Sequence, residues 1–524
     1  MSGLQGVHFV AGGTEPADGE LFRGVDAATG EDLAPAYGDA TAAQVERACA
    51  AAAAAAPAFA RAAPAVRAAL LRDVAAGIVA LGDELVRRVQ AETALPAARV
   101  EGERARTVMQ LNQFADLAEE GSWVDACIDH ADPDRAPLPK PDLRRMHVGL
   151  GPVAVFGASN FPLAYSVAGG DTASALAVGC PVIVKGHPAH PGTSELVGRV
   201  VHEAVQKHGL PVGTFSLLHG RRHETGGALV RHDAVKAVGF TGSHVGGRAL
   251  VDLAATRREP IPVFAEMGSA NPVVVLPAAM AARGAAIAEQ LAASALLAQG
   301  QFCTSPGMVL WLAGAGDEAF AKTLEDRLTA AQPGPTVHPT IRQGFERAMA
   351  ELSGLPVEVS AAREAPQGAC EVRPALLRAT PEALLANERL RAEIYGPAVL
   401  GVACRDEAEL LALLEALDGH LTATVHGDGE DFERHPAVVG ALRQKAGRLI
   451  ANGVPTGVEV SAAMVHGGPY PAASDARFSA VGATAVLRWV RPVCWQDWPH
   501  DQLPEELRDD NPRGIIRVVN GARC

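Results

Sequence analysis

Four polar residues in the middle of the chain carry side chains that can support nucleophilic catalysis. Asn160 follows the apolar run VAVFG, Lys185 ends VIVK, Glu266 ends VFAE, and Cys303 lies in the polar turn AQGQFCTSPG. A thiolate is a nucleophile, a carboxylate can act as a general base, and an amide can donate a hydrogen bond to an oxyanion. Three of them also have a structural interpretation: cysteine as a buried apolar residue, asparagine as a helix cap, and glutamate as an ion-pair partner.

Alternating apolar runs and helical stretches predict how these residues are positioned. Residues 41–120 are rich in helix formers, the runs VAVFG, VIVKG, AVKAVGF and IPVFAEM follow, and a second alternating section spans about 271–465. Alternation of strand and helix predicts parallel sheets covered on both faces, with ligands at the carboxyl ends of the strands. One long helical stretch separates Glu266 from Cys303 and could return the chain to the same sheet edge.

A glycine-bearing turn, GFTGSHVGG, precedes another helical stretch. Gly242, Ser243 and Gly247 could bring backbone N–H groups of a helix start close to a phosphate. The turn is neither a GxGxxG fingerprint nor a P-loop, and glycines in a turn are more often part of an ordinary connection.

Composition limits the class of protein. The chain has 524 residues, 48% hydrophobic and 20% charged, with a net charge of −14, which argues against a nucleic-acid-binding surface. Its eight cysteines are far apart and form no CxxC pair, so we expect neither disulfides nor a zinc or other metal site. The N-terminus has no signal-peptide pattern, and no apolar run reaches the roughly 20 residues of a membrane span. These features predict a cytoplasmic location.

Six motifs, in chain order, resemble those of the aldehyde dehydrogenase superfamily: FGASNFP, VIVKGHP, GFTGSHVGG, EMGSANP, GQFC and EIYGP. The resemblance covers nearly the whole chain and implies that Cys303 attacks an aldehyde, while Asn160 and the Cys303 backbone N–H stabilise the oxyanion. Hydride transfer to a nicotinamide cofactor then leaves a thioester, which water activated by Glu266 hydrolyses. Phe302 before the nucleophile, and Met267 and Ser269 after the glutamate, depart from the usual residues but keep this chemistry.

The resemblance also implies a cofactor site. It assigns Lys185 to the adenine-side ribose, Ser243 to the pyrophosphate and Glu393 to the nicotinamide-side ribose, and it places Gly242, Gly247 and Phe156 in the same site. Many NAD-preferring relatives carry a glutamate three residues after the lysine, where this chain has Pro188. Arg221, Arg222 and His223 precede the glycine turn, and arginine is a strong phosphate partner. We therefore expect NADP, with Arg222 as a cofactor residue and NAD as the alternative.

The segment NGVPTGVEVSAAMVHGGPYPAASD resembles one branch of the superfamily, which includes α-ketoglutaric semialdehyde dehydrogenases and an NADP-dependent fatty aldehyde dehydrogenase. By analogy, His466 lies near the active site and relays protons or orients substrate; a histidine that only shapes a loop is the alternative. The expected reaction is oxidation of α-ketoglutaric semialdehyde to 2-oxoglutarate, and a fatty or general aliphatic aldehyde is the alternative substrate.

Three further classes stay open: a CoA-acylating enzyme, an acyl-phosphate reductase, and a non-enzymatic protein of the same fold. Glu266 argues against the first two, because a base that activates water suits hydrolysis. The joint presence of Asn160, Glu266 and Cys303 argues against the third.

The resemblance predicts an α/β aldehyde dehydrogenase-like fold: a Rossmann-type cofactor domain, an α/β catalytic domain and a small β oligomerisation element. We place the cofactor domain at 1–127 and 151–270, the catalytic domain at 271–465, the bridging strands at 128–150 and 484–495, and a tail at 496–524. Exposed β edges need pairing, which predicts a homodimer or homotetramer.

Overall fold

The first of two seven-stranded sheets forms the centre of the N-terminal half. The computed structural model describes residues 3–524. Five neighbouring strands of this sheet pair in parallel, and the two N-terminal strands extend it antiparallel at one edge. Their order is β11 (Val263–Glu266), β10 (Ala237–Thr241), β7 (Val153–Phe156), β8 (Val182–Lys185), β9 (Phe215–Leu218), β1 (His8–Val10) and β2 (Gly13–Glu15).

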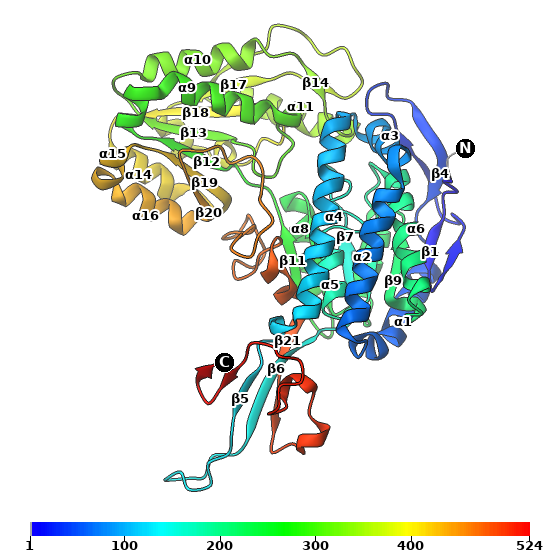
Figure 1. The fold of residues 1–524 in the computed structure, drawn as a ribbon. Helices are drawn as coiled ribbons and strands as arrows, with labels where there is room; N and C mark the ends of the chain where they lie inside the picture. Colours follow the sequence, from blue (N-terminus) through cyan, green and yellow to red (C-terminus); the bar gives the residue numbers. More distant parts are fainter. Residues whose placement is uncertain (1–2) are drawn as a thin grey trace.

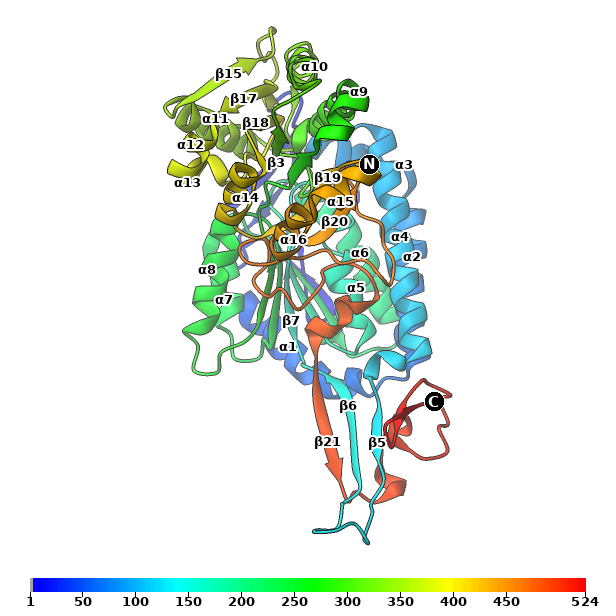
Figure 2. The ribbon, with the colours of Figure 1, turned by 90° about the vertical axis from the view of Figure 1, so that its left-hand side faces the viewer.

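Helices cover both faces of this sheet, as the alternating pattern predicts. Val153 and Val155 of β7 pack against one layer of helices, whereas Ala154 and Phe156 pack against the other. Figure 2 shows the strands between α7 and α8 on one side and α2 and α4 on the other. The helices are α1 (Ala42–Ala60), α2 (Pro64–Ala80), α3 (Gly82–Thr93), α4 (Ala97–Glu120), α5 (Gly170–Ala177), α6 (Pro191–Lys207), α7 (His223–Arg231) and α8 (His244–Ala255).

The second seven-stranded sheet lies in the upper left part of Figure 1. It is parallel except for its edge strand β15, which runs antiparallel to β17. Its order is β15 (Val357–Ala361), β17 (Ala375–Ala379), β18 (Ala398–Cys404), β13 (Met308–Leu312), β12 (Pro272–Val275), β19 (His420–His426) and β20 (Ala446–Ala451).

Two helical layers enclose this second sheet. Val273 and Val275 of β12 belong to the apolar core under α9 and α10, and Val274 belongs to the core on the opposite face. The helices are α9 (Pro277–Leu296), α10 (Asp317–Thr329), α11 (Pro339–Ser353), α12 (Pro381–Ala386), α13 (Glu388–Arg391), α14 (Glu407–Ala416), α15 (Gly429–Arg434) and α16 (Pro436–Lys445).

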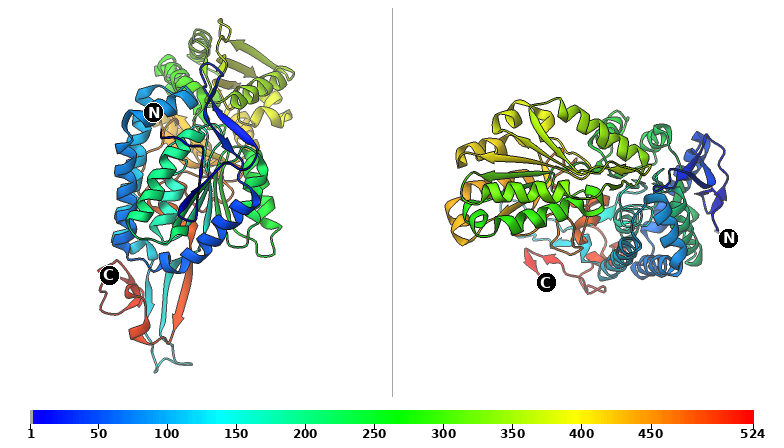
Figure 3. Two further views of the ribbon diagram at one scale, coloured as in Figure 1. Left: turned by 90° about the vertical axis from the view of Figure 1, so that its right-hand side faces the viewer. Right: turned by 90° about the horizontal axis from the view of Figure 1, so that it is seen from above.

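The fold also contains two short two-stranded sheets. One pairs β14 (Gly334–Pro335) with β16 (Glu371–Val372), and the other pairs β3 (Leu21–Val25) with β4 (Asp32–Gly38). The sheet of β3 and β4 packs beside α3 and α6 (Figure 3).

A β arm projects from the body at the bottom of Figure 1. Its five strands are β21 (Val490–Gln496), β6 (Leu143–Gly149), β5 (Cys127–Asp129), β22 (Val518–Val519) and β23 (Ala522–Arg523), in that order. The strand expected over 484–495 was wrong in its first part, because Ala483–Trp489 forms a 3₁₀ helix. Trp489 is fully buried there, and its Nε1–H donates to Ser174 Oγ at 2.8 Å. Within the tail, residues 496–524, the strands β22 and β23 extend the sheet of the arm.

Across residues 3–524, no helix is both long and apolar enough to cross a membrane.

Candidate active site

Three loops bring Glu266, Cys303 and His466 together. Glu266 is the last residue of β11, Cys303 lies in the turn before β13, and His466 follows β20. The Sγ atom of Cys303 lies 3.3 Å from His466 Nε2, and the same nitrogen lies 3.1 Å from Glu266 Oε1. One imidazole nitrogen therefore faces both the candidate nucleophile and the candidate base.

Burial makes this cluster electrostatically strong. Glu266 is 5% exposed and His466 is 1% exposed. Burial opposes the charged form of His466, but the charges of Glu266 and Cys303 outweigh it and raise the pKa of the imidazole to about 10. An imidazolium at neutral pH suits a site that holds a thiolate. The ligand atoms of the three side chains also lie within 4.8 Å of one another, so the group has the donor set for a metal ion.

Backbone contacts hold the His466 loop against β11. Glu266 forms a β bridge with Ala473, and Met267 N donates to Ala472 O at 2.8 Å. The His466 N–H donates to Ser479 Oγ at 3.0 Å. The position of the imidazole is thus fixed through its own backbone as well as through its ring.

The turn before Cys303 contains three consecutive residues with positive φ, and a close backbone contact requires glycine at the third. Ala298 and Gln299 adopt positive φ values of 48° and 54°, and Gly300 has φ 66°. A Cβ on Gly300 would lie 2.1 Å from Gly396 O, so only glycine fits between this turn and the EIYGP segment. This reversal after α9 directs Cys303 back to the edge of β11.

Asn160 lies beside the turn that carries Cys303. Its Nδ2 donates to Gln301 O at 2.8 Å, two residues before Cys303. An amide nitrogen carries two N–H groups, so a second donor remains for an oxyanion. Asn271 fixes the other side of the turn, where its Nδ2 donates to Cys303 O at 2.9 Å.

The residues expected to bind the adenine end of a cofactor also gather in one place. Lys185 ends β8, where burial lowers the pKa of its amine to about 8 against the charge of Asp39. Arg222 Nε lies 2.6 Å from Asp39 Oδ2, and its Nη1 lies 3.1 Å from Glu20 Oε2. Asp39 therefore contacts the arginine and lies within electrostatic range of the lysine, and the guanidinium already has two acidic neighbours.

The start of α8 fits a pyrophosphate. Gly242 to Val245 are exposed, which leaves the first N–H groups of this helix uncovered. Ser243 caps the helix by accepting from Gly246 N at 3.2 Å. A Cβ on Gly247 would lie 2.6 Å from Met267 Sδ, so this glycine lets α8 approach the segment after β11.

Two further residues of the expected cofactor site, Glu393 and Phe156, lie near the segment after β11 and near Phe240 of β10. A Cβ on Gly268 would lie 2.3 Å from Glu393 Oε2, so the carboxylate covers the segment that follows Glu266. Burial raises the pKa of Glu393 to about 7. Phe156 contacts Phe240 edge-to-face, with 6.3 Å between ring centroids, and packs under Gly226 of α7.

Comparison with known proteins agrees with this arrangement. A model of the aldehyde dehydrogenase family matches residues 14–470. The chain belongs to the aldehyde dehydrogenase family. It is an oxidoreductase, and the cofactor of this family is NAD or NADP.

Two curated aldehyde dehydrogenases are similar over nearly their full lengths. "Alpha-ketoglutaric semialdehyde dehydrogenase 2" of Azospirillum brasilense is 52% identical over 95% of this chain and 96% of its own. "Alpha-ketoglutaric semialdehyde dehydrogenase" of Acinetobacter baylyi is 41% identical over 99% of both chains. Among solved structures, lactaldehyde dehydrogenase of Escherichia coli matches with a TM-score of 0.80 and 21% identity over 94% of this chain and 98% of its own, which shows the shared fold.

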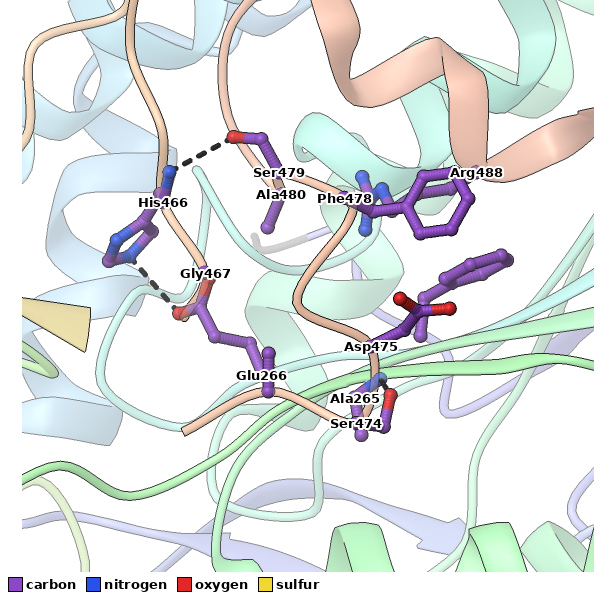
Figure 4. Close-up of a pocket in the computed structure, with 12 residues that line it drawn as sticks. Ala265, Glu266, His466, Gly467, Ser474, Asp475, Phe478, Ser479, Ala480 and Arg488 are labelled. Carbon is purple, nitrogen blue, oxygen red and sulfur yellow. Dashed lines mark hydrogen bonds and ion pairs between the residues drawn. The ribbon is translucent and has the colours of Figure 1, made fainter. Parts of the chain in front are cut away.

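A small pocket borders Glu266 and His466 in this aldehyde dehydrogenase, with about 20 Å³ of space open to the centre of a water molecule. Figure 4 shows Ser479, Asp475 and Arg488 around it, with Glu266 and His466 joined by one of the dashed lines. This space is sufficient for about one water molecule beside the carboxylate.

Several residues of the site were missed by sequence reasoning. Gln301, Asn271 and Ser479 position the nucleophile turn and the His466 loop through the contacts above. Gln301 and Asn271 lie inside or beside the motifs GQFC and EMGSANP, so their polar side chains were a usable signal. Ser479 lies in no motif, and its role depends on a contact across a loop.

Proposed function

We propose that the protein oxidises α-ketoglutaric semialdehyde to 2-oxoglutarate with NADP through a thioester on Cys303. The observation that carries the mechanism is the position of His466 Nε2, which lies 3.3 Å from Cys303 Sγ and 3.1 Å from Glu266 Oε1. The names of the two curated relatives support the substrate.

The first half of the reaction makes a covalent intermediate. The imidazolium of His466 stabilises the Cys303 thiolate, which attacks the aldehyde carbon and forms a thiohemiacetal. The Asn160 amide and the Cys303 backbone N–H donate to the oxyanion. NAD(P), when bound, supplies the acceptor for the hydride. Glu393, Lys185 and the start of α8 would hold the two riboses and the pyrophosphate.

The second half hydrolyses the thioester. Glu266 takes a proton from a water molecule, which attacks the acyl carbon and releases the acid and the Cys303 thiolate. His466 contacts both partners, so it keeps the carboxylate and the sulfur in place and takes part in moving the proton. The pocket beside Glu266 has space for about one water molecule, next to the carboxylate that takes the proton.

A preference for NADP belongs to the proposal. Pro188 replaces the carboxylate that would repel a 2′-phosphate, and Arg222 adds a half-exposed guanidinium close to Asp39, which neighbours Lys185. A phosphate would compete with Glu20 for Arg222, because that contact is exposed and therefore weak.

One observation favours a second substrate class. Phe161, Tyr165, Phe302 and Val460 belong to one apolar cluster next to Cys303, which suits the chain of an aliphatic aldehyde. A CoA-acylating reaction is disfavoured, because Glu266 lies beside the nucleophile, where it would promote hydrolysis.

A substrate panel tests the proposal. We would measure kcat/KM for α-ketoglutaric semialdehyde, succinic semialdehyde, hexanal and dodecanal, each with NADP and with NAD, and repeat one series with CoA. We expect the keto-semialdehyde to exceed hexanal by more than about tenfold, equivalent to about 1.4 kcal/mol. Preference for dodecanal would replace the proposed substrate with a fatty aldehyde.

We also propose a homodimer or homotetramer in the cytoplasm. The strand β21 forms one edge of the arm sheet and offers a surface for pairing with a second copy. A reducing compartment keeps Cys303 in the thiol form that the mechanism needs. Light scattering of the purified protein measures the oligomeric state.

A further inference from the structure

Two arginines of α4 lie over aromatic rings beside the nucleophile. The guanidinium carbon of Arg99 lies 4.5 Å from the Phe161 ring centroid and 5.2 Å from that of Phe302. The guanidinium carbon of Arg106 lies 5.4 Å from the Tyr165 ring centroid, and its Nη2 donates to the Tyr165 hydroxyl at 3.0 Å. Residues seven apart share one helix face, so both side chains reach the same apolar cluster.

This cluster borders the chemical centre directly. Phe302 precedes Cys303 in sequence, and its ring contacts Phe161 edge-to-face with 5.3 Å between centroids. The Tyr165 ring centroid lies 6.3 Å from that of His466. Tyr165 therefore contacts Arg106 and lies next to the imidazole of His466.

Arg106 has no carboxylate partner among residues 3–524. Its neighbour Arg99 differs, because Arg99 Nη1 pairs with Glu103 Oε2 at 2.8 Å. The Nε–H of Arg106 is buried without a hydrogen-bond partner in the described part of the chain. A partly buried cation without a counter-ion is costly unless a ligand supplies one.

A third arginine, from another element, adds positive charge near the nucleophile. Arg448 of β20 donates to the carbonyl groups of Gly457 and Pro455, which leaves its charge without a carboxylate in residues 3–524. Burial lowers the pKa of its guanidinium, while the charges of Cys303 and Tyr165 oppose this, so Arg448 lies within electrostatic reach of the nucleophile.

We propose that Arg106, together with the Tyr165 hydroxyl, binds the distal carboxylate of a short aldehyde acid whose carbonyl carbon lies at Cys303. The proposal rests on the proposed function and identifies the residue that gives it specificity. A guanidinium forms paired hydrogen bonds with a carboxylate, and Phe161 and Phe302 pack on the carbon chain between the two ends. Arg448 strengthens the positive field without direct contact.

The test compares substrates of equal chain length in matched variants. We would measure kcat and KM for α-ketoglutaric semialdehyde and for pentanal in the wild type, Arg106→Met, Arg106→Lys and Arg104→Met. Arg104 lies on the same helix and donates to Gly82 O, so it controls for loss of a helix arginine. We expect Arg106→Met to lower kcat/KM for the acid by at least tenfold, mainly through KM, and to leave pentanal within twofold. Arg106→Lys should restore part of the loss, and Arg104→Met should behave as wild type.

The outcomes separate the two proposals. A wild type that prefers the acid, with a preference that survives in Arg106→Met, overturns the carboxylate site and leaves the proposed function standing. A wild type that prefers pentanal overturns both. Equal losses for both substrates in Arg106→Met mean that the residue is structural, and this result also overturns the proposal.

Discussion

Replacement of His466 by glutamine tests the electrostatic core of the site. Glutamine is polar and of similar size, but it cannot carry the charge that the imidazole holds between Cys303 and Glu266. Without that charge, the carboxylate of Glu266 faces the sulfur with no cation between them, which disfavours the thiolate. We therefore expect Cys303 to react more slowly with an electrophile at neutral pH in His466→Gln.

The geometry sets the size of the effect. Two unit charges 3.3 Å apart interact by about 5 kcal/mol at an effective dielectric constant of about 20. Burial removes hydration from both groups, and this cost opposes the attraction. We take about 2–3 kcal/mol as the net stabilisation of the thiolate by the imidazolium. At about 1.4 kcal/mol per factor of ten, this corresponds to a roughly 30- to 150-fold slower reaction of the sulfur.

The assay is the rate of Cys303 alkylation by iodoacetamide as a function of pH, with peptide mass spectrometry to select this cysteine. Because the pKa of the His466 imidazole is raised to about 10, its charge persists through the neutral range, and the wild type should be alkylated faster than His466→Gln throughout that range. His426→Gln is the control, since this imidazole is equally buried but has Arg283 rather than Cys303 as its charged neighbour. Superimposable profiles of His466→Gln and the wild type would refute the reasoning.

Three further predictions concern other steps. Glu266→Gln should keep a single-turnover burst of NADPH but lose at least about 100-fold in steady-state rate, because only hydrolysis needs the base; stopped-flow absorbance separates the phases, and a lost burst would contradict this. Asn160→Ala should lower kcat by about 100- to 1,000-fold with little change in KM, as expected for one oxyanion donor; unchanged steady-state kinetics would remove it from that role. Arg222→Gln should lower kcat/KM for NADP by about tenfold and leave NAD unaffected, since the contact is half-exposed; equal losses with both cofactors would argue for a structural role.

The sequence was informative where strand ends carry the chemistry. Glu266 and Lys185 end the strands that the apolar runs predict, and Asn160 lies in the predicted turn. Parallel strands place their carboxyl ends at one edge, so local patterns were sufficient to group these residues. Cys303 joins them because glycine and two positive-φ residues reverse the chain after α9, and the polar composition of AQGQFC is typical of such a turn.

Long-range contacts explain what the sequence left out. Arg106 lies in a helix with many charged residues, and its spacing gives no sign that it reaches Tyr165 across the core. The strand expected over 484–495 was wrong in its first part because Trp489 is drawn into a buried contact with Ser174, which competes with β pairing. The partners of Arg222 were also unforeseen, since Asp39 and Glu20 lie far away in the chain.

The central claim is that Cys303 becomes acylated, and mass spectrometry of the acyl-enzyme tests it most directly. Glu266→Gln would be mixed with α-ketoglutaric semialdehyde and NADP, quenched in acid, digested and analysed. The account predicts that the peptide containing Cys303 gains the mass of one 2-oxoglutaryl group and that Cys303→Ala gains none and forms no NADPH. Full NADPH formation by Cys303→Ala, or an acyl group on another residue, would contradict the account.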